Sequence, residues 1–538
     1  MKTKTSQKNK ILNWEKTGKS YVEWVAKTSL KDFFYKNASF ENFSIWWITN
    51  LCNKDNIIAN DWYYQLKDIL FEKKKIEYNR FKFYLVFILK LHKNFFSSLL
   101  SCFFIKLICF TRFNKISRKR CFYSYHYNIF EKKNLAYDKN FGLTPIKKNK
   151  NQNYYLINII RPNEFIFNLF NYKKRYRKLN IPFFILNEYI KFDDIIKIYY
   201  FSIISTIKTI NYIKKKKNLF IINKKDCSNV LIPMLVSSFS GNIQTSLIYA
   251  KALNNFFNMN RTKTFINYGE FNPGFRSAYF FVRKSKYVSK ILTIQHSYAN
   301  KNLLYYFNQR QEFSMKLEDE GKYFSPSPDY YLLHGNHFKR LLDSYYLKKT
   351  KIIGALKYDS LKFNLKNKNS KSKRTILICP TASGIGDEDV LIDYLKKCNL
   401  NNIRLILSPH PVLKNETVKK FNDKFEKKIN FKVFDNLSSF ELLFHADLVI
   451  CALSSLALES LICKVPSVRI FNPEHPHFFD LKDGIYNIKS WKELDDLINK
   501  KKKIVRNKKV QSTISNIFYK LDNRAYLRFW NFIKKQNL

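Results

Sequence analysis

The sequence predicts an α/β fold made of two facing Rossmann-like domains with a helical N-terminal extension. Short apolar segments alternate with helical patterns through the middle and the C-terminal part of the chain. A polar, basic segment at 363–374 divides them into two series and predicts a linker. Each series has the pattern of a parallel sheet with helices on both faces.

The composition limits the classes of protein to which the chain can belong. Its 538 residues, 46% of them hydrophobic, leave room for several domains and exclude overall disorder. Nine cysteines without a Cys-x-x-Cys motif exclude a disulfide scaffold and a zinc ribbon, and indicate a reducing compartment. The basic N-terminus is not followed by a short apolar run, so no secretory signal is expected.

The formal net charge of +54 has two interpretations. Lys, Asn, Ile, Phe and Tyr are over-used together, as an AT-rich genome imposes, so most of the charge is expected on solvated faces. The alternative is attraction to a polyanion, either an anionic membrane surface or nucleic acid. We favour the membrane, because the basic residues are spread along the chain and no nucleic-acid-binding motif accompanies them.

The first 118 residues are predicted to be mostly helical. The segment 81–110 is very apolar, but its core at 94–110 is shorter than the ~20 residues of a spanning helix and contains Lys106. We therefore expect a buried helix or an interfacial hairpin here.

Five apolar segments in each series are predicted strands. Those of the first series are 154–160, 229–237, 264–268, 290–295 and 330–334, and those of the second are 375–380, 404–408, 431–434, 447–451 and 467–471. The domain bounds that follow are 1–118 for the helical extension, 119–362 for the first domain, 363–374 for the linker, 375–490 for the second domain and 491–538 for C-terminal helices.

Ligands of parallel α/β sheets bind beyond the carboxyl ends of the strands, so the residues that follow each predicted strand are the candidates. In the second domain, Thr381, Ser383 and Gly384 follow the first strand and can expose backbone N–H groups to a phosphate, although an ordinary turn explains them as well. His410 stands between two prolines after the next strand. It is either a donor to a phosphate or sugar hydroxyl, or a surface histidine at a turn.

The strand at 447–451 is followed by Ser454 and Ser455 at the start of a helical pattern. Two hydroxyls beside free N–H groups suit a phosphate, whereas simple N-capping accounts for only one of them. Glu459 comes about one turn later, within reach of a ribose diol.

These residues carry a resemblance to a known family. The segment ADLVICALSSLALESLICKVPSV resembles the donor-nucleotide signature of GT-B glycosyltransferases, and SPHP resembles a strand end of capsule and sialic-acid-type transferases. Ser408 and Lys464 depart from these patterns, which often have a basic residue and a glycine at those positions.

The middle of the chain is similar to a bacterial surface-carbohydrate biosynthesis family. The similarity runs through NYGEF, TIQHSYANKNLLYY, SPSPDYYLLHG and GALKY, with Lys357 where the family usually has arginine. It implies a cytoplasmic glycosyltransferase at the inner face of the cytoplasmic membrane, building O-antigen or capsule-like polysaccharide. The donor would be a nucleotide sugar held by the C-terminal domain, and the acceptor a lipid-linked or free glycan held by the N-terminal domain. Such enzymes usually need no metal or other cofactor, and the family favours inversion.

Inverting transfer needs a base that takes the proton of the acceptor hydroxyl. Glu270 is the first choice and His296 the second, since both follow predicted strands of the first domain. The alternatives are a Glu270 that binds the acceptor or pairs with Arg276, and a structural strand-end His296. The small residues Ser238, Ser240, Gly241 and Gly335 are expected to line the cleft on the acceptor side.

Other functions compatible with these patterns are a non-catalytic scaffold in polysaccharide assembly, a nucleotide-sugar epimerase of the same fold and a glycerophosphotransferase. Nucleic-acid binding is a more distant alternative. Bound nucleotide without turnover would indicate the scaffold.

Overall fold

The computed structural model describes the chain apart from residues 1, 55–60, 73, 109–116, 133–134, 160–173, 175, 177, 179–180, 270–271, 297, 299–303, 305–325, 343–348, 360–372, 381–386, 410–413, 426–430, 435–438, 452–453, 471–484 and 500–507. The predicted linker therefore lies almost entirely outside the described residues.

The first part of the fold is a seven-stranded parallel sheet. Its strands, in spatial order, are β13 (Thr350–Ile352), β12 (Tyr330–Leu333), β11 (Lys290–Ile294), β10 (Thr264–Asn267), β3 (Arg120–Tyr125), β6 (Asn153–Asn158) and β7 (Phe183–Ile185). From β3 the chain adds strands first on one side and then, from β10 on, on the other. The order reverses between β3 and β10, which is the topological switch point of a doubly wound sheet.

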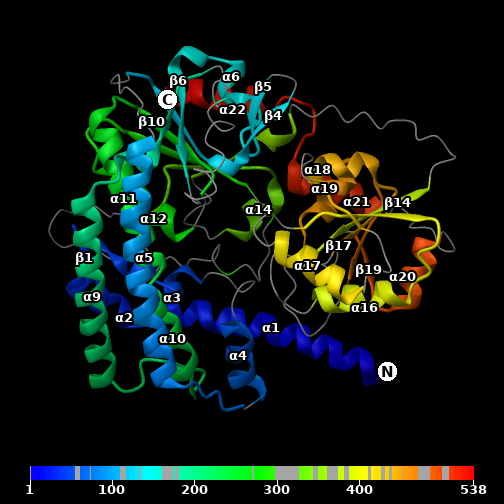
Figure 1. Cartoon of the computed structure of the whole chain (residues 1–538), viewed down its shortest axis with the longest axis horizontal. Coiled ribbons are helices and arrows are strands. Elements are labelled where there is room, and N and C mark those ends of the chain that lie inside the picture. The colour runs from blue at the N-terminus through cyan, green and yellow to red at the C-terminus, as the bar shows by residue number, and fades with distance from the viewer. Residues whose placement is uncertain are drawn as a thin grey trace.

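The second part is a six-stranded parallel sheet with the same winding. Its spatial order is β16 (Phe431–Lys432), β15 (Ile403–Leu407), β14 (Arg374–Cys379), β17 (Leu448–Cys451), β18 (Ser467–Ile470) and β19 (Tyr486–Ile488), with the switch point between β14 and β17. The two sheets lie beside each other (Figure 1). The predicted class, a two-domain, GT-B-like α/β fold with a helical N-terminal part, is confirmed.

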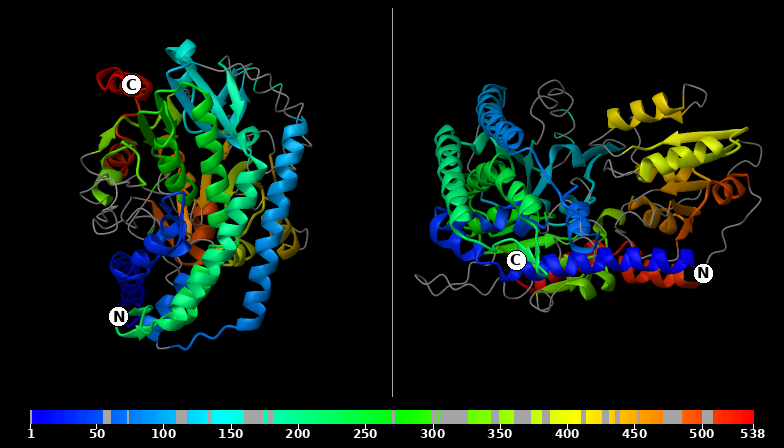
Figure 2. Two further views of the ribbon diagram at one scale, coloured as in Figure 1. Left: turned by 90° about the vertical axis from the view of Figure 1, so that its left-hand side faces the viewer. Right: turned by 90° about the horizontal axis from the view of Figure 1, so that it is seen from below.

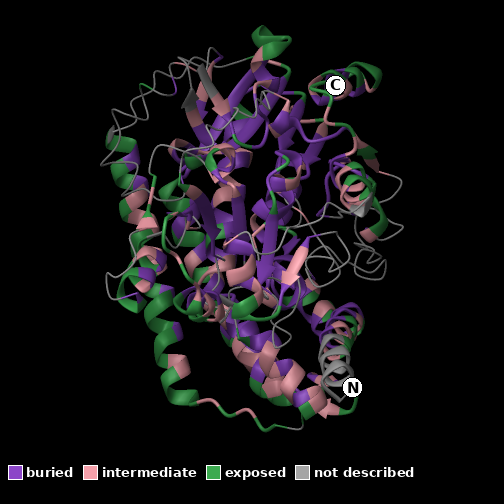
Figure 3. Cartoon of the chain, turned by 90° about the vertical axis from the view of Figure 1, so that its right-hand side faces the viewer, coloured by how far each residue is buried: buried purple, intermediate pink, exposed green. Residues whose placement is uncertain are grey.

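Helices cover the sheets, and the strands lie buried between them (Figure 3). On the first sheet these include α11 (Asn242–Met259) and α12 (Pro273–Arg283), and on the second α16 (Asp387–Lys397), α17 (Lys414–Lys424), α19 (Leu456–Ile462) and α20 (Trp491–Ile498). One predicted strand is wrong: 229–237 forms most of helix α10 (Ser228–Ser237), which contains Pro233. A short apolar run fits a buried helix as well as a buried strand.

The N-terminal helices share one hydrophobic core with the first sheet. They are α1 (Lys2–Lys27), α2 (Leu30–Asn37), α3 (Asn50–Asn53), α4 (Trp62–Lys67) and α5 (Arg80–Ile108), with the hairpin β1 (Ser39–Phe40) and β2 (Phe43–Ser44) between α2 and α3. The fully buried Arg276 of α12 donates to the carbonyls of Trp47 and Cys52 at 3.3 and 3.4 Å. The N-terminal part is thus anchored on the first sheet's helices.

The C-terminal helices are α21 (Lys508–Phe518) and α22 (Ala525–Lys535). The chain returns from the second sheet to the first, where α22 packs beside β6 and β10 (Figure 1). The rings of Phe529 and Trp530 contact Phe122 of β3. The last helix therefore joins the two parts of the molecule.

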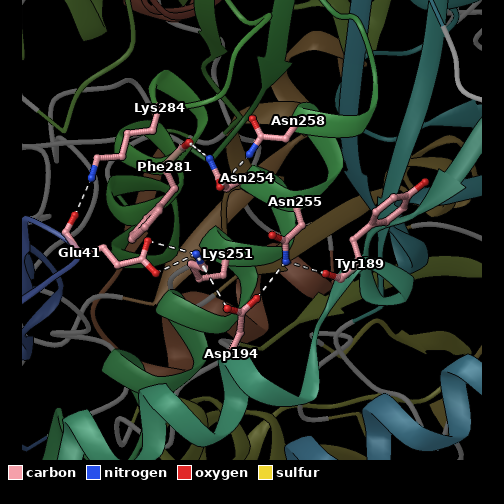
Figure 4. Close-up of polar contacts among 9 residues, drawn as sticks. All are labelled: Glu41, Tyr189, Asp194, Lys251, Asn254, Asn255, Asn258, Phe281 and Lys284. Carbon is pink, nitrogen blue, oxygen red and sulfur yellow. Dashed lines mark hydrogen bonds and ion pairs between the residues drawn. The ribbon is translucent and has the colours of Figure 1, made fainter.

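A polar network holds α9 (Phe192–Lys215) against α11 (Figure 4). Lys251 of α11 lies 2.8 Å from the Glu41 carboxylate, at the turn between β1 and β2, and 3.9 Å from Asp194 of α9. Asn255, one turn further along α11, donates to Asp194 at 3.0 Å and to the Tyr189 carbonyl at 3.1 Å. Three segments distant in sequence are joined through one lysine.

The apolar segment at 81–110 differs from its prediction. Its described residues, 81–108, form neither a buried helix nor a hairpin, but belong to the single 29-residue helix α5, which leaves one apolar face exposed. By length and composition α5 is able to cross a membrane.

Candidate functional site

Two of the predicted donor residues, Ser454 and Ser455, follow β17 at the switch point of the six-stranded sheet. Cys379 and Cys451, the last residues of β14 and β17, are partners in the sheet register. The carboxyl ends of β14 and β17 therefore lie side by side. Thr381, Ser383, Gly384 and His410 lie outside the described residues.

Ser454 and Ser455 have different environments. The Ser454 hydroxyl, one residue before the N-cap of α19, accepts a hydrogen bond from the Leu456 N–H at 3.3 Å. Ser455 is exposed and makes no capping bond. Its hydroxyl is the more accessible of the two to a ligand.

Glu459 of α19 reaches the first part of the molecule. Its Oε1 accepts hydrogen bonds from Lys357 Nζ at 2.8 Å and from the Tyr358 hydroxyl at 2.6 Å. Lys357 and Tyr358 belong to the short helix η7 (Leu356–Tyr358), which follows β13. The Lys357 and Glu459 side chains are 17% and 14% exposed, so this ion pair is largely withdrawn from water. The segment that follows β13 in the first sheet thus contacts the helix that follows β17 in the second sheet.

The charges around Glu459 are mainly positive. Burial raises the pKa of Glu459, but Lys357, the Tyr358 hydroxyl and Lys139 outweigh it and hold this pKa below its usual value. Burial and the Glu459 carboxylate raise the pKa of Tyr358 well above normal, so its hydroxyl keeps its proton. Burial and Lys357 lower the pKa of Lys139, whereas Glu459 and Asp138 raise it. Lys357 is thus paired with Glu459, and Lys139 interacts with two carboxylates, those of Glu459 and Asp138.

The carboxyl ends of the first sheet carry a second polar group of residues. The Tyr268 hydroxyl, just after β10, accepts from the Tyr125 N–H at 2.9 Å and from Asn128 Nδ2 at 2.6 Å. Asp138 accepts from the Ser124 hydroxyl and from the Asn140 and Phe141 N–H groups. These residues gather at the switch point between β3 and β10.

Asp138 has an unusual acidity. Complete burial raises the pKa of this carboxyl to about 6, and the hydrogen bonds from Ser124, Phe141 and Asn140 offset only part of the rise. The group therefore titrates close to neutral pH.

Of the two candidate bases, His296 is described and Glu270 lies outside the described residues. His296 follows β11, is exposed, and has its ring centroid 6.1 Å from that of Tyr268. His334, after β12, is buried, and its backbone N–H donates to Gln295 Oε1 at 2.9 Å. Burial, Lys357 and His296 lower the pKa of His334 far below its usual value, so it is neutral.

The expected acceptor residues Ser238, Ser240 and Gly241 do not follow a strand, because the segment before them is α10. They join α10 to α11 and face the N-terminal helices: the Ser238 hydroxyl accepts from the Asn50 N–H at 2.8 Å, and the Ser240 carbonyl accepts from Asn94 of α5. Both serines are buried.

Gly335 opens α14 (Asn336–Leu341) and packs on the backbone of α21. A Cβ atom there would lie 2.3 Å from the Asn516 carbonyl oxygen and 2.6 Å from that of Ile517. This glycine allows the close approach of α21, a helix that also packs on α19.

Sequence reasoning missed Lys139 and Tyr358. Lys139 follows the short hairpin of β4 (Ile129–Lys132) and β5 (Leu135–Asp138), and no motif marks it. Tyr358 lies within the quoted GALKY segment, so its position beside Lys357 was the available signal. Among the residues that the structure describes, no group of three or more His, Cys, Asp or Glu side chains is placed to hold a metal ion.

Comparison with known proteins finds neither a matching family model nor a matching curated protein. Solved structures do match. HepE from Anabaena, in complex with UDP and glucose, is 11% identical, with 78% of this chain and 99% of HepE covered and a TM-score of 0.39. The wall teichoic acid polymerase TagF is 12% identical, with 82% of this chain and 97% of TagF covered and a TM-score of 0.40. MnaA from S. aureus, in a structure with UDP, is 10% identical, with 78% of this chain and 97% of MnaA covered and a TM-score of 0.41.

Proposed function

We propose that this chain is a glycosyltransferase that moves a sugar from a nucleotide-sugar donor to a surface-polysaccharide intermediate, with inversion and without a metal. The observation that carries the proposal is the placement of the donor motif. Ser454 and Ser455 follow one of the two strands that flank the switch point of a doubly wound sheet, which is where such sheets bind nucleotides.

The donor would lie between the segments after β14 and β17. The exposed Ser455 hydroxyl would donate to a phosphate oxygen, and Glu459, Lys357 and Lys139 would lie beside the nucleotide. Lys357 and Lys139 both interact with the Glu459 carboxylate. Their positive charges suit a leaving nucleoside diphosphate, whose negative charge grows as the bond to the sugar breaks.

The acceptor would lie at the carboxyl ends of the first sheet. His296 is exposed there and would take the proton of the acceptor hydroxyl, with Glu270 as the alternative base. The acceptor oxygen then forms a bond to the anomeric carbon, and the bond from that carbon to the phosphate oxygen breaks. The electron pair leaves with the nucleoside diphosphate.

The sequence motifs give the finer assignment. The resemblance of the GALKY and TIQHS segments to a surface-carbohydrate biosynthesis family favours O-antigen or capsule-type glycans as the product and a lipid-linked or glycan acceptor. The structure adds that Lys357 of GALKY bonds to Glu459 of the donor motif, so the two motifs form one contact.

A thermal-shift screen tests the proposal. Purified protein is heated with UDP, GDP, CDP, CMP and their sugar conjugates. A ligand that binds only the folded state adds ~2.7 kcal/mol of stability at 100 times its dissociation constant. We expect one nucleotide family to raise the melting temperature, and Ser455→Ala to reduce that rise.

The control is Ser515→Ala, which changes an exposed serine of α21. It should leave the shift intact. A cooperative melt that no nucleotide moves would contradict the proposal, as would a shift that Ser455→Ala and Glu459→Gln both leave unchanged. Binding without release of nucleotide in the presence of glycan acceptors would point to a scaffold.

A further inference from the structure

Two helices of the first part present a continuous apolar face. On α5 the exposed apolar side chains recur every three or four residues and lie on one side of the helix. They include Leu85, Leu89, Phe96, Leu100, Phe103 and Leu107, with Leu89 60% exposed and Phe96 58%. From Leu85 to Leu107 this stripe is about 33 Å long, at ~1.5 Å per residue.

Helix α9 continues this face. Its exposed apolar side chains, Phe192, Ile196, Tyr200, Ile204 and Ile207, also follow one side of the helix. The two helices pack side by side (Figure 2). Phe95 stacks on Tyr199 with ring centroids 4.1 Å apart, and Lys106 lies 5.0 Å from the Phe192 ring, so the helices run antiparallel. We call their joint exposed surface the α5–α9 face.

The opposite side of α5 is fixed to the protein. Phe87, Leu91, Cys102 and Ile105 are buried, and the Cys102 thiol donates to the Ile190 carbonyl at 3.4 Å. A helix that crossed a bilayer would have to detach from these contacts. The packing instead holds α5 and α9 as a flat pair with one side open.

The charges on these helices are basic. Exposed lysines accompany the apolar side chains, namely Lys82, Lys90, Lys93 and Lys106 on α5 and Lys197 and Lys208 on α9. Helix α5 contains no acidic residue, and α9 contains only Asp193 and Asp194, in its first turn. Asp194 is buried and directed inward to Lys251 and Asn255 (Figure 4).

From this geometry we infer that the α5–α9 face docks on an anionic lipid surface, with both helices lying in the plane of the membrane. The apolar side chains enter the boundary between headgroups and acyl chains, and the lysines extend to the lipid phosphates. The same basic charge disfavours a second copy of the chain as the occupant, because two such faces would repel each other. The inference stands apart from the proposed transferase activity.

Vesicle sedimentation of the full chain tests the docking. We expect binding to vesicles of phosphatidylcholine and phosphatidylglycerol in equal parts, much weaker binding to phosphatidylcholine alone, and a decrease with added salt. The stripe variant, Leu89→Ser/Phe96→Ser/Leu100→Ser, should bind at least roughly tenfold more weakly, since three apolar side chains no longer enter the lipid. The variant Lys90→Gln/Lys93→Gln should lose affinity only for the anionic vesicles.

The matched control is Met259→Ser/Trp491→Ser, which changes two exposed apolar side chains on other helices and should leave binding unchanged. Equal melting temperatures of stripe variant and control exclude unfolding as the cause of weaker binding. If the stripe variant melts at a lower temperature than the control, amide hydrogen exchange of the unchanged protein tests the docking instead. We then expect addition of anionic vesicles to slow exchange at 80–108 and 192–215. No binding of the unchanged protein to anionic vesicles, or equal binding of stripe variant and control, overturns the inference. So does self-association through the α5–α9 face without vesicle binding.

Discussion

Lys357 and Glu459 form an ion pair of 2.8 Å between the short helix after β13 of the first sheet and helix α19 of the second. The pair is largely withdrawn from water, and the Tyr358 hydroxyl bonds to the same carboxylate oxygen. Two motifs that lie about a hundred residues apart in the sequence are thus one contact. We expect this contact to couple ligand binding in the second part to the position of the first.

The first prediction concerns this pair. Lys357→Gln and Glu459→Gln each leave a largely buried polar partner incompletely paired, so each should lower the free energy of unfolding by about 1–3 kcal/mol. The double variant Lys357→Gln/Glu459→Gln should lose less than the sum of the two single losses, which a double-mutant cycle measures by urea unfolding. A loss in the double variant equal to the sum of the two single losses would show that the two side chains do not interact.

The second prediction is a pH dependence set by Asp138. Its pKa of about 6 in the folded protein lies above the ordinary value of 3.8, so the folded state holds the proton to higher pH. The free energy of unfolding from this group should fall as the pH rises from about 4 to about 6, and stay level above. Asp138→Asn should remove that decline. Parallel pH profiles of the two proteins, measured by urea unfolding, would contradict this account.

A third prediction concerns Gly335. Its Cβ position is occupied by backbone atoms of Asn516 and Ile517, which cannot rotate away as a side chain does. Gly335→Ala should therefore displace α21 and lower the free energy of unfolding by about 1–3 kcal/mol. Gly241→Ala is the matched control, because its Cβ would meet only one atom, at 3.9 Å. Equal stability of both variants would disprove the tight packing.

A fourth prediction tests the Lys251 network. Lys251→Met removes the cation that lies near both Glu41 and Asp194, and Asp194 is only 12% exposed. We expect a loss of about 1–2 kcal/mol in chemical unfolding. Lys197→Met, an exposed lysine of α9, should change stability by no more than ~0.5 kcal/mol. Equal free energies of unfolding of Lys251→Met and Lys197→Met would show that the Lys251 network does not stabilise the fold.

Most central strands were predictable because each is a short apolar run buried on both faces, as in β14 and β17. The central strand β3 (Arg120–Tyr125) was not among the predicted strands. The edge strands β7, β13 and β19 have three residues each, too few to show a period. The helix α10 resembled a strand because it is a short apolar run. Only its tertiary packing decides between the two.

The site was predictable in part. Ser454, Ser455 and Glu459 were found because they follow a clear strand, and the strand order then places them at a switch point. Lys139 was not predicted, because its approach to Glu459 depends on how the two sheets meet. The strand order also could not be read from the sequence, since crossovers are set by packing between distant segments.

Amide hydrogen exchange with and without saturating nucleotide tests the central claim most directly. The full chain is measured alone and with UDP, and then with CDP, GDP and CMP. The account predicts that one of these nucleotides slows exchange in the segments 380–387 and 452–460, which follow β14 and β17. Protection confined to other segments, or no protection by any of the four, would contradict a nucleotide-sugar donor site at the switch point of the second sheet.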